Sequence, residues 1–583
     1  MISPSTEDLA LKQVLSVKER RRLPSFAQWK LLPRFLNRRE KTIAAGAMLV
    51  AIFAVCALGF QFIKSHNSSL PAVGGTYTEG VIGYPALINP LYANVSDVDN
   101  DLAHLIYSGL MRFDPQDGLV PDLAEKYEIS PDGKTYTFTL RTGVLFQNGD
   151  PLTSSDVSFT IGAIENPEYR STLQSAFDGV TVETPNDQTV IFKLKEPFAP
   201  FLSYLAIGIL PSHVWEEVAP SSAQLTPLNI KPIGSGPYQF EKLTKDSRGV
   251  LRSLTLARNK SFYRGGNYIN ELSFKFAGSA DELTTMLRNH NIEGAVTLPF
   301  DDIARFADDR SLNISHAILP QYTAAFINTK TASALSDVSI RKALNVGTDR
   351  QSIINTVLSG HANALMAPFF SGTPGGTPPE NIPGADASAA GALLDAAGYK
   401  IPAEGGTRMK GEKPLAVSLA VTNASELTRV ADELKKQWEA LGFAVTITAF
   451  SQQDLQDAVL KPRAFDVLLA GELYGAFKDP YPYWHSSQAA FPGLNITGFV
   501  NRQADDAITT IRTTPDEEKR SSAYGTLAQV FKEQIPAVFL YQPTYTYAAA
   551  SKIKGIALPS VNLPSDRFAD VNEWYIKTKP VLK

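Results

Sequence analysis

The sequence has little cysteine and little histidine: Cys56 is the single cysteine among 583 residues, and there are seven histidines. One thiol cannot form an internal disulfide or a site with several cysteine ligands. The histidines are scattered, and none stands in an HxxxH or HExxH arrangement. A metal site would have to be assembled from distant segments, so we expect neither a metal nor any other cofactor.

Motifs for covalent catalysis and for phosphate binding are also absent. The sequence contains neither the G-x-S-x-G pattern of a nucleophile elbow nor the G-x-x-x-x-G-K-[ST] pattern of a phosphate-binding loop. Adjacent acid pairs such as Asp301-Asp302 and Asp505-Asp506 do not face each other on a helix or strand, which favours a solvated surface. Two distant carboxylates could still meet as a glycosidase pair. We expect a protein that is not an enzyme.

Charge of one sign is not in large excess over the whole chain, because 55 Lys/Arg stand against 59 Asp/Glu, a formal net charge of −4. This balance argues against a nucleic-acid binder. Positive charge is concentrated in residues 1–41, which hold ten Lys/Arg and four Asp/Glu. The rest of the chain is correspondingly acidic.

The segment Thr42–Ile63 follows this basic head and carries no charge over 22 residues. As a helix it is about 33 Å long, enough to span a hydrocarbon core of about 30 Å. The positive-inside rule places residues 1–41 in the cytoplasm and the large remainder outside the cell or in the periplasm. A buried helix and a cleaved signal peptide are the alternatives, but a 41-residue basic head is long for a signal peptide. We predict an uncleaved single-pass anchor in the cell membrane.

The sequence leaves two interpretations of the basic head open, one of which is a contact with membrane lipid. It could form an amphipathic helix on anionic lipid, or it could be a solvated tail that only sets the topology. Residues 64–75, beyond the membrane segment, are polar and small and are predicted to be a linker.

Beyond the linker, helical and strand patterns alternate. Leu415–Val421 is apolar, a helical pattern follows and stops at Gly442, and Phe443–Phe450 has strand character again. Strands that alternate with helices predict an α/β fold with a mostly parallel sheet. Aromatic residues gather in Leu473–His485, which is either buried packing between lobes or the lining of a ligand cleft.

Six stretches resemble the extracellular solute-binding proteins of family 5, the peptide/nickel class that serves ATP-driven (ABC) importers. The most diagnostic is Pro121–Thr160 (PDLAEKYEISPDGKTYTFTLRTGVLFQNGDPLTSSDVSFT). The others, in the order of the family, are Ile88–Pro90, Ile106–Leu110, Ile233–Phe240, Ala257–Phe276 and Tyr322–Phe370. The resemblance covers about residues 76–575.

This resemblance implies a two-lobed α/β fold like that of periplasmic binding proteins, of the enlarged cluster C type. Lobe I would comprise residues 76–321 with an extra subdomain, lobe II residues 322–540, and residues 541–583 would return to lobe I. A solute, expected to be an oligopeptide, would be held between the lobes and passed to an ABC permease and ATPase. The alternative is an anchored peptide sensor or assembly factor that uses the same fold without transport.

The resemblance also implies ligand-binding positions by motif order. Peptide binders of the family have an aspartate three residues before an Asp-Pro pair; here the pair is Asp479-Pro480 and the matching residue is Ala476. The dipeptide branch holds the ligand carboxylate with an arginine, and the matching stretch Val421–Ala424 has none. Both departures make recognition of free peptide termini at these positions doubtful. The positions expected to line the cleft are Asn94, Val95, Tyr169, Tyr322, Asn423 and Tyr474.

Overall fold

We describe the protein from a computed structural model. The structure describes residues 30, 37–296, 298–331, 334–371, 373–475, 479–558 and 560–582. It divides into two compact units, residues 1–71 with 578–583 and residues 72–577.

The described part of the first unit consists mainly of helix α4 (Arg38–His66), which contains the predicted membrane segment 42–63. Within the described residues, α4 provides the one stretch, Arg38–Leu58, that is long and apolar enough to cross a membrane. The predicted linker 64–75 contains the end of α4 and strand β1 (Asn67–Ala72), which pairs with β22 (Lys577–Leu582). The uncleaved anchor and its orientation stay predictions.

The second unit is built on a 12-stranded sheet in which strand β21 (Ala537–Ala550) is central. β21 pairs antiparallel with four strands, namely β12 (Gly294–Val296), β13 (Leu312–Ile318), β14 (Gln321–Ile327) and β15 (Ala362–Ala364). At one end of the sheet lie β19 (Ala444–Phe450), β18 (Ala416–Thr422) and β20 (Val467–Leu473); at the other lie β2 (Thr76–Ile82), β11 (Glu271–Ala277), β10 (Leu251–Arg258) and β9 (Tyr238–Lys245).

The prediction of a mostly parallel sheet is wrong. Among the strands of the described residues, parallel pairing is limited to β18 with β19 and β20, and to β2 with β11 and β12. One isolated parallel bridge joins Ile318 to Ser560. The prediction was based on the β-α-β pattern of residues 415–450. In that segment β18, helix α15 (Ser425–Ala440) and β19 do form a parallel unit. The long strand β21 and its antiparallel partners could not be recognised from local periodicity.

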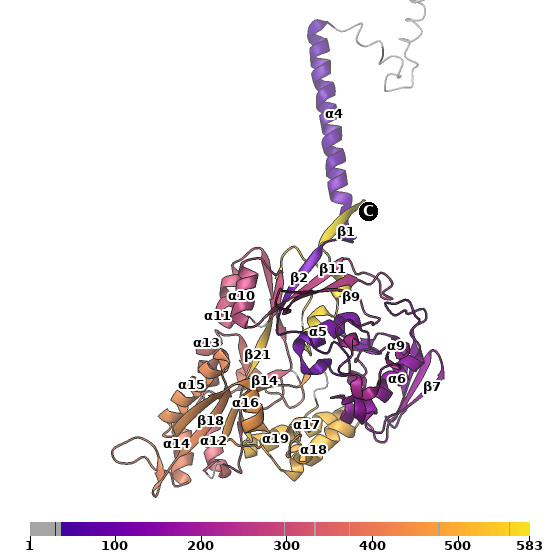
Figure 1. Cartoon of the computed structure of the whole chain (residues 1–583). Coiled ribbons are helices and arrows are strands. Elements are labelled where there is room, and N and C mark those ends of the chain that lie inside the picture. The colour runs from indigo at the N-terminus through magenta and orange to yellow at the C-terminus, as the bar shows by residue number, and fades with distance from the viewer. Residues whose placement is uncertain are drawn as a thin grey trace, which may run out of the picture. The chain divides into compact units, whose positions relative to one another are not determined.

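The two lobes of the unit meet at β14 and β21 (Figure 1). Figure 1 shows β2, β9 and β11 on the lobe I side, and β18 with helices α12 (Val338–Gly347), α14 (Ala387–Ala396) and α15 on the lobe II side. Buried apolar side chains of 322–541 form clusters separate from the main cluster of 77–319 and 547–574. The boundaries 76–321, 322–540 and 541–583 stay predictions.

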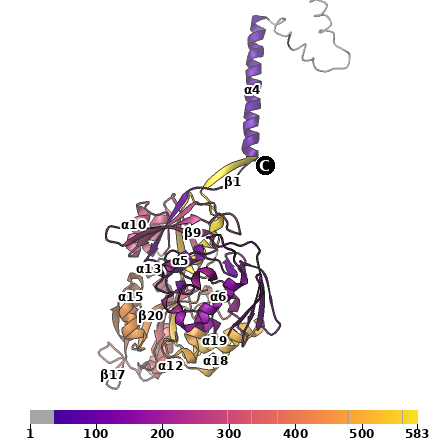
Figure 2. The ribbon, with the colours of Figure 1, turned by 45° about the vertical axis from the view of Figure 1, so that its right-hand side comes forward.

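Lobe I carries an additional subdomain with a four-stranded antiparallel sheet. Its strands, in spatial order, are β5 (Ala124–Ile129), β6 (Thr135–Leu140), β8 (Thr189–Lys193) and β7 (Thr181–Asn186). Alternate side chains of β6 are buried, as its alternating sequence predicts. Helix α6 (Ser154–Glu165) belongs to this subdomain, and Figure 2 shows it above helices α18 (Arg502–Thr513) and α19 (Glu517–Gln534) of lobe II.

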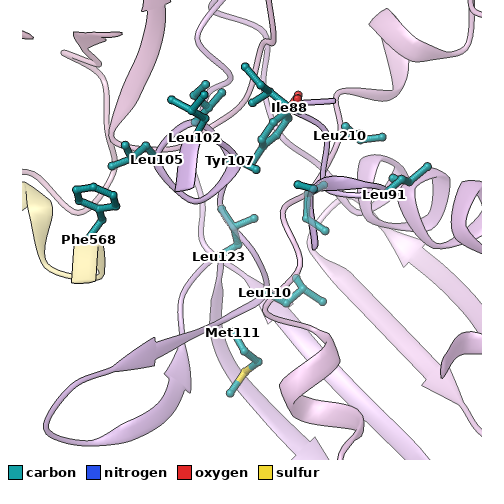
Figure 3. Close-up of a cluster of buried hydrophobic side chains, with 14 of the residues drawn as sticks. Ile88, Leu91, Leu102, Leu105, Tyr107, Leu110, Met111, Leu123, Leu210 and Phe568 are labelled. Atoms are coloured by element: carbon teal, nitrogen blue, oxygen red, sulfur yellow. The ribbon is translucent and has the colours of Figure 1, made fainter. Parts of the chain in front are cut away.

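The core of lobe I is organised around helix α5 (Asp97–Ile106), which begins after the N-cap Ser96. Leu102, Leu105 and the following Tyr107 point into a cluster with Leu123 and Phe568 (Figure 3). A close backbone approach to the end of α5 explains the glycine pattern of 234–236: a Cβ at Gly234 would lie 2.1 Å from the carbonyl oxygen of Ile106. That segment is the turn that leads into β9.

Candidate functional site: a cavity between the lobes

A cavity of about 670 Å³ lies between the two lobes. Its volume is in the range of small-molecule binding sites, and its lining is largely apolar and aromatic, as is usual for such sites. Lobe I provides most of the wall, and lobe II contributes Asp479, Ile511, Pro515, Arg520 and Tyr524. A ligand in this cavity would touch both lobes.

The lobe I wall includes the end of 3-10 helix η1 (Ala93–Val95), helix α5 and the segment 562–572. Arg567 anchors that segment although its own side chain is fully buried. Its guanidinium contacts the carboxylates of Asp101 on α5 (2.7 and 2.5 Å) and Glu79 on β2 (3.0 Å), and it lies 4.1 Å from the ring centre of Phe568. Buried charges held in this way fix the wall relative to the sheet.

The two lobes touch beside the cavity. The backbone N–H of Ala199 in lobe I donates to the carbonyl oxygen of Arg512 on α18 (2.8 Å). The Arg512 guanidinium lies over the rings of Phe198 (4.8 Å) and Tyr481 (4.2 Å), and its Nε is 3.5 Å from the buried carboxylate of Asp479. This arrangement holds the lobes together at the cavity by a cation–π contact and a main-chain hydrogen bond.

An aromatic cluster lies at the start of β14 and the end of β20. Tyr322 is fully buried and its ring meets that of Tyr474 edge-on, with centroids 5.4 Å apart. The Tyr322 hydroxyl donates to the half-buried carboxyl of Glu472, and the Trp484 indole N–H donates to the Tyr474 hydroxyl (2.9 Å). Burial raises the pKa of Glu472 to about 8. The described aromatics of 473–485 therefore pack against one another within lobe II, not between the lobes.

The structure disperses the six residues that motif order selected. Asn94 lines the cavity and its Oδ1 accepts a hydrogen bond from the Thr172 hydroxyl (2.6 Å). Val95 is 75% exposed on the same turn but does not line the cavity, and Tyr169 is buried, with its carbonyl oxygen bound by the Tyr92 hydroxyl (2.8 Å).

The other three lie on lobe II. Tyr322 and Tyr474 share the aromatic cluster, and the exposed Asn423 follows β18, where its backbone N–H donates to Phe450 (2.8 Å). All six remain predictions of ligand contact. Ala476 and Phe477, which the sequence analysis also singled out, lie outside the described residues.

Several cavity residues were not selected from the sequence. They come from segments that the sequence separates widely: His104, Arg112, Asp122, Arg264, Arg520 and Asn562. Asp122 lies within the most diagnostic stretch, so its motif could have indicated it. Arg520 and Tyr524 stand one helical turn apart, but nothing in their own segment indicates that this face of the helix meets lobe I. Within the described part of the chain, no group of three or more His, Cys, Asp or Glu side chains could hold a metal ion.

Comparison with known proteins agrees with this architecture. Residues 118–492 match the family described as bacterial extracellular solute-binding proteins, family 5 Middle. The oligopeptide-binding protein AppA of Bacillus subtilis is 25% identical over 553 residues, which cover 92% of this chain and 99% of AppA.

Two solved structures share the fold. AppA of Bacillus subtilis in complex with a nonapeptide has a TM-score of 0.73 and 25% identity, covering 87% of this chain and 100% of that chain. NikZ of Campylobacter jejuni in complex with Ni(L-His) has a TM-score of 0.73 and 26% identity, covering 86% and 99%.

The family match covers more than half of the chain, and the fold is shared with solved structures of solute-binding proteins. The chain is thus a member of family 5 of the bacterial extracellular solute-binding proteins, and it is a binding protein, not an enzyme.

Proposed function

We propose that this protein is the membrane-anchored receptor of an ABC importer and that it captures a peptide in the cavity between its lobes. The observation that carries the proposal is the cavity of about 670 Å³, whose wall comes from both lobes and is rich in aromatic side chains. Aromatic and main-chain groups bind extended peptides without requiring a particular sequence. The relative AppA, named for oligopeptides and solved with a nonapeptide, supports a peptide as the ligand.

The proposal is tested with the full chain purified in detergent. Mass spectrometry of what denaturation releases should find peptides at about one per protein, and the same peptides should rebind and be released unchanged. Reproducible cleavage of a bound peptide that one carboxylate substitution abolishes would contradict the binding function.

A substitution that fills the cavity sharpens this test. Ala206 is exposed and lines the cavity, so Ala206→Trp should weaken peptide binding by more than about tenfold because the indole occupies ligand space. Ala219 is an exposed alanine of the same lobe that does not line the cavity, and Ala219→Trp should leave binding unchanged. Equal effects of the two variants would show that the peptide binds elsewhere.

The membrane anchor makes a separate prediction about topology. Ten basic residues before an uncharged 22-residue segment should keep residues 1–41 in the cytoplasm. A protease added outside intact cells (to spheroplasts where an outer membrane is present) should then digest the large unit and spare an epitope placed in residues 1–41. Digestion of the epitope with protection of the large unit would invert this topology.

A further inference from the structure

The charges on the cavity wall can be assigned to partners one at a time, beginning with the acids. Asp122 lies 3.6 Å from the guanidinium of Arg264, and Asp479 lies 3.5 Å from that of Arg512. Asp566 accepts two backbone N–H groups of its own turn, at 2.8 and 3.0 Å. A ligand ammonium group would have to compete with these internal partners, so the acids of the wall do not form a ready site for a cation.

The cations of the wall are also engaged, with one exception. Arg112 forms an ion pair with Asp114 (2.9 Å), and Arg264 is held by Asp122 and by the side chain of Asn572 (2.8 Å). Burial and nearby arginines lower the pKa of His104 to about 4, so this side chain is neutral at pH 7. Arg520 remains: among the described residues, no carboxylate oxygen lies within 4.0 Å of its guanidinium.

The position of Arg520 suits a group that enters the cavity from solvent. It lies in the first turns of α19, and its Nη1 donates to the carbonyl oxygen of Thr514 just before the helix (3.1 Å). This bond restrains the guanidinium and leaves its other N–H groups for a ligand. Pro515 of lobe II and Gly133 of lobe I also line the cavity. The side chain of Arg520 is therefore only partly exposed to solvent.

We infer that Arg520 binds an anionic group of the ligand and that this group is the terminal carboxylate of a peptide. The planar guanidinium fork matches a carboxylate in two parallel hydrogen bonds, and a restrained fork loses less entropy on binding than a free side chain. The inference rests on the proposed function, since it names the part of the peptide that the cavity selects.

The test uses tetra-alanine with a free carboxylate and the same peptide as its carboxamide, titrated calorimetrically into the full chain in detergent. Hydrogen bonds to a charged group predict that the carboxamide binds wild-type protein about tenfold more weakly than the acid. Arg520→Gln should weaken binding of the acid by a similar factor and leave binding of the carboxamide within about twofold of wild type. Unchanged carboxamide binding also shows that the variant is folded.

Arg502 provides the matched control, because it is an arginine of the neighbouring helix α18 whose side chain is 95% exposed. Arg502→Gln should bind both peptides as wild type does. Equal affinity of wild-type protein for acid and carboxamide would overturn the inference and leave the proposed function standing. Failure of wild-type protein to bind either form, or the amino-acetylated forms of each, would instead contradict the proposed peptide function.

Discussion

The buried carboxyl groups beside Arg567 in lobe I and beside Tyr322 in lobe II are held differently. In lobe I, Glu79 and Asp101 are both within 3.0 Å of the fully buried guanidinium of Arg567. In lobe II, Glu472 has the hydroxyl of Tyr322 as its partner, and no cationic nitrogen of the described chain lies within 4.0 Å of it. One lobe therefore contains an ionic cluster and the other an acid among aromatic rings.

The difference decides which acid is charged at neutral pH. Burial raises the pKa of Asp101 to about 6 even though Arg567 acts in the opposite direction, so this carboxyl is mostly ionised at pH 7. Burial raises the pKa of Glu472 to about 8, because the hydrogen bond from the Tyr322 hydroxyl offsets only part of the effect of burial. Glu472 is therefore mostly protonated at pH 7. Asp566 of lobe I, equally buried and held by two backbone N–H groups, also has a pKa raised to about 6, so hydrogen-bond donors as well as a cation keep a buried acid charged.

The largest expected effect comes from removing the cation of lobe I. Arg567→Met keeps most of the side-chain volume but leaves Asp101 and Glu79 buried without a cation. Glu79 keeps the hydroxyls of Tyr77 and Tyr547 as partners. Loss of one member of a buried ion pair typically costs about 3–5 kcal/mol of unfolding free energy. Denaturant unfolding of the full chain in detergent, followed by tryptophan fluorescence, measures this loss for the lobe I transition.

Arg350 is the control within lobe II. It is also buried, but its guanidinium is satisfied by the carbonyl oxygens of Leu365 and Phe539 and by Asn345, with no acid. Arg350→Met leaves unpaired neutral acceptors, so we expect a smaller loss of about 1–3 kcal/mol. If Arg567→Met were no more destabilising than Arg350→Met, the ionic cluster would have no special role.

The sequence predicted the parts of the fold whose signals are local. The helix of the β-α-β unit ends where Gly442 adopts a φ of +93°, close to the predicted end, and β6 shows the predicted alternation of buried residues. Family motifs then supplied the two-lobed arrangement, which no local pattern contains. The direction of the strands around β21 was missed because it depends on pairings between residues far apart in the chain.

The cavity was predictable only in outline for the same reason. Asn94 and Arg520 line one space although more than 400 residues separate them, and neither position has a distinctive local pattern. Tyr322 and Tyr474 were selected as cleft residues because they stand at family positions, and the structure shows them as neighbours in a packed cluster with Trp484. An aromatic residue at a strand end can either line a ligand cleft or pack in a buried cluster. Which of the two it does depends on the side chains around it in the folded protein.

A smaller effect is expected where an acid of lobe II does have a cation. Arg512→Met removes the partner of Asp479 and the cation–π contact with Phe198 of lobe I. We expect a loss of about 2–3 kcal/mol, less than for Arg567, because the contact is longer and Asp479 has no second acid beside it. Peptide affinity should fall as well, because the contact that joins the lobes is lost. Unchanged stability and affinity would show that Arg512 contributes nothing to closure.

The smallest effect concerns the uncharged acid and depends on pH. The folded-state pKa of Glu472 is about 8, above its usual value near 4.5, so between these values the folded protein keeps a proton that the unfolded chain loses. This contribution to stability is fully present near pH 4.5 and is lost as the pH rises through 8. Because Glu472 is half-buried, we expect a change of about 1–2 kcal/mol between pH 5 and pH 8.

Glu472→Gln cannot titrate, so the wild-type protein should lose stability relative to this variant as the pH rises from 5 to 8. Melting temperatures of both proteins at several pH values measure the difference. Tyr322→Phe removes the hydroxyl that lowers the pKa of Glu472, so it should move the loss of stability to higher pH. A pH-independent difference between wild type and Glu472→Gln would mean that Glu472 is ionised like Asp101 of lobe I, and the contrast between these two acids would fail.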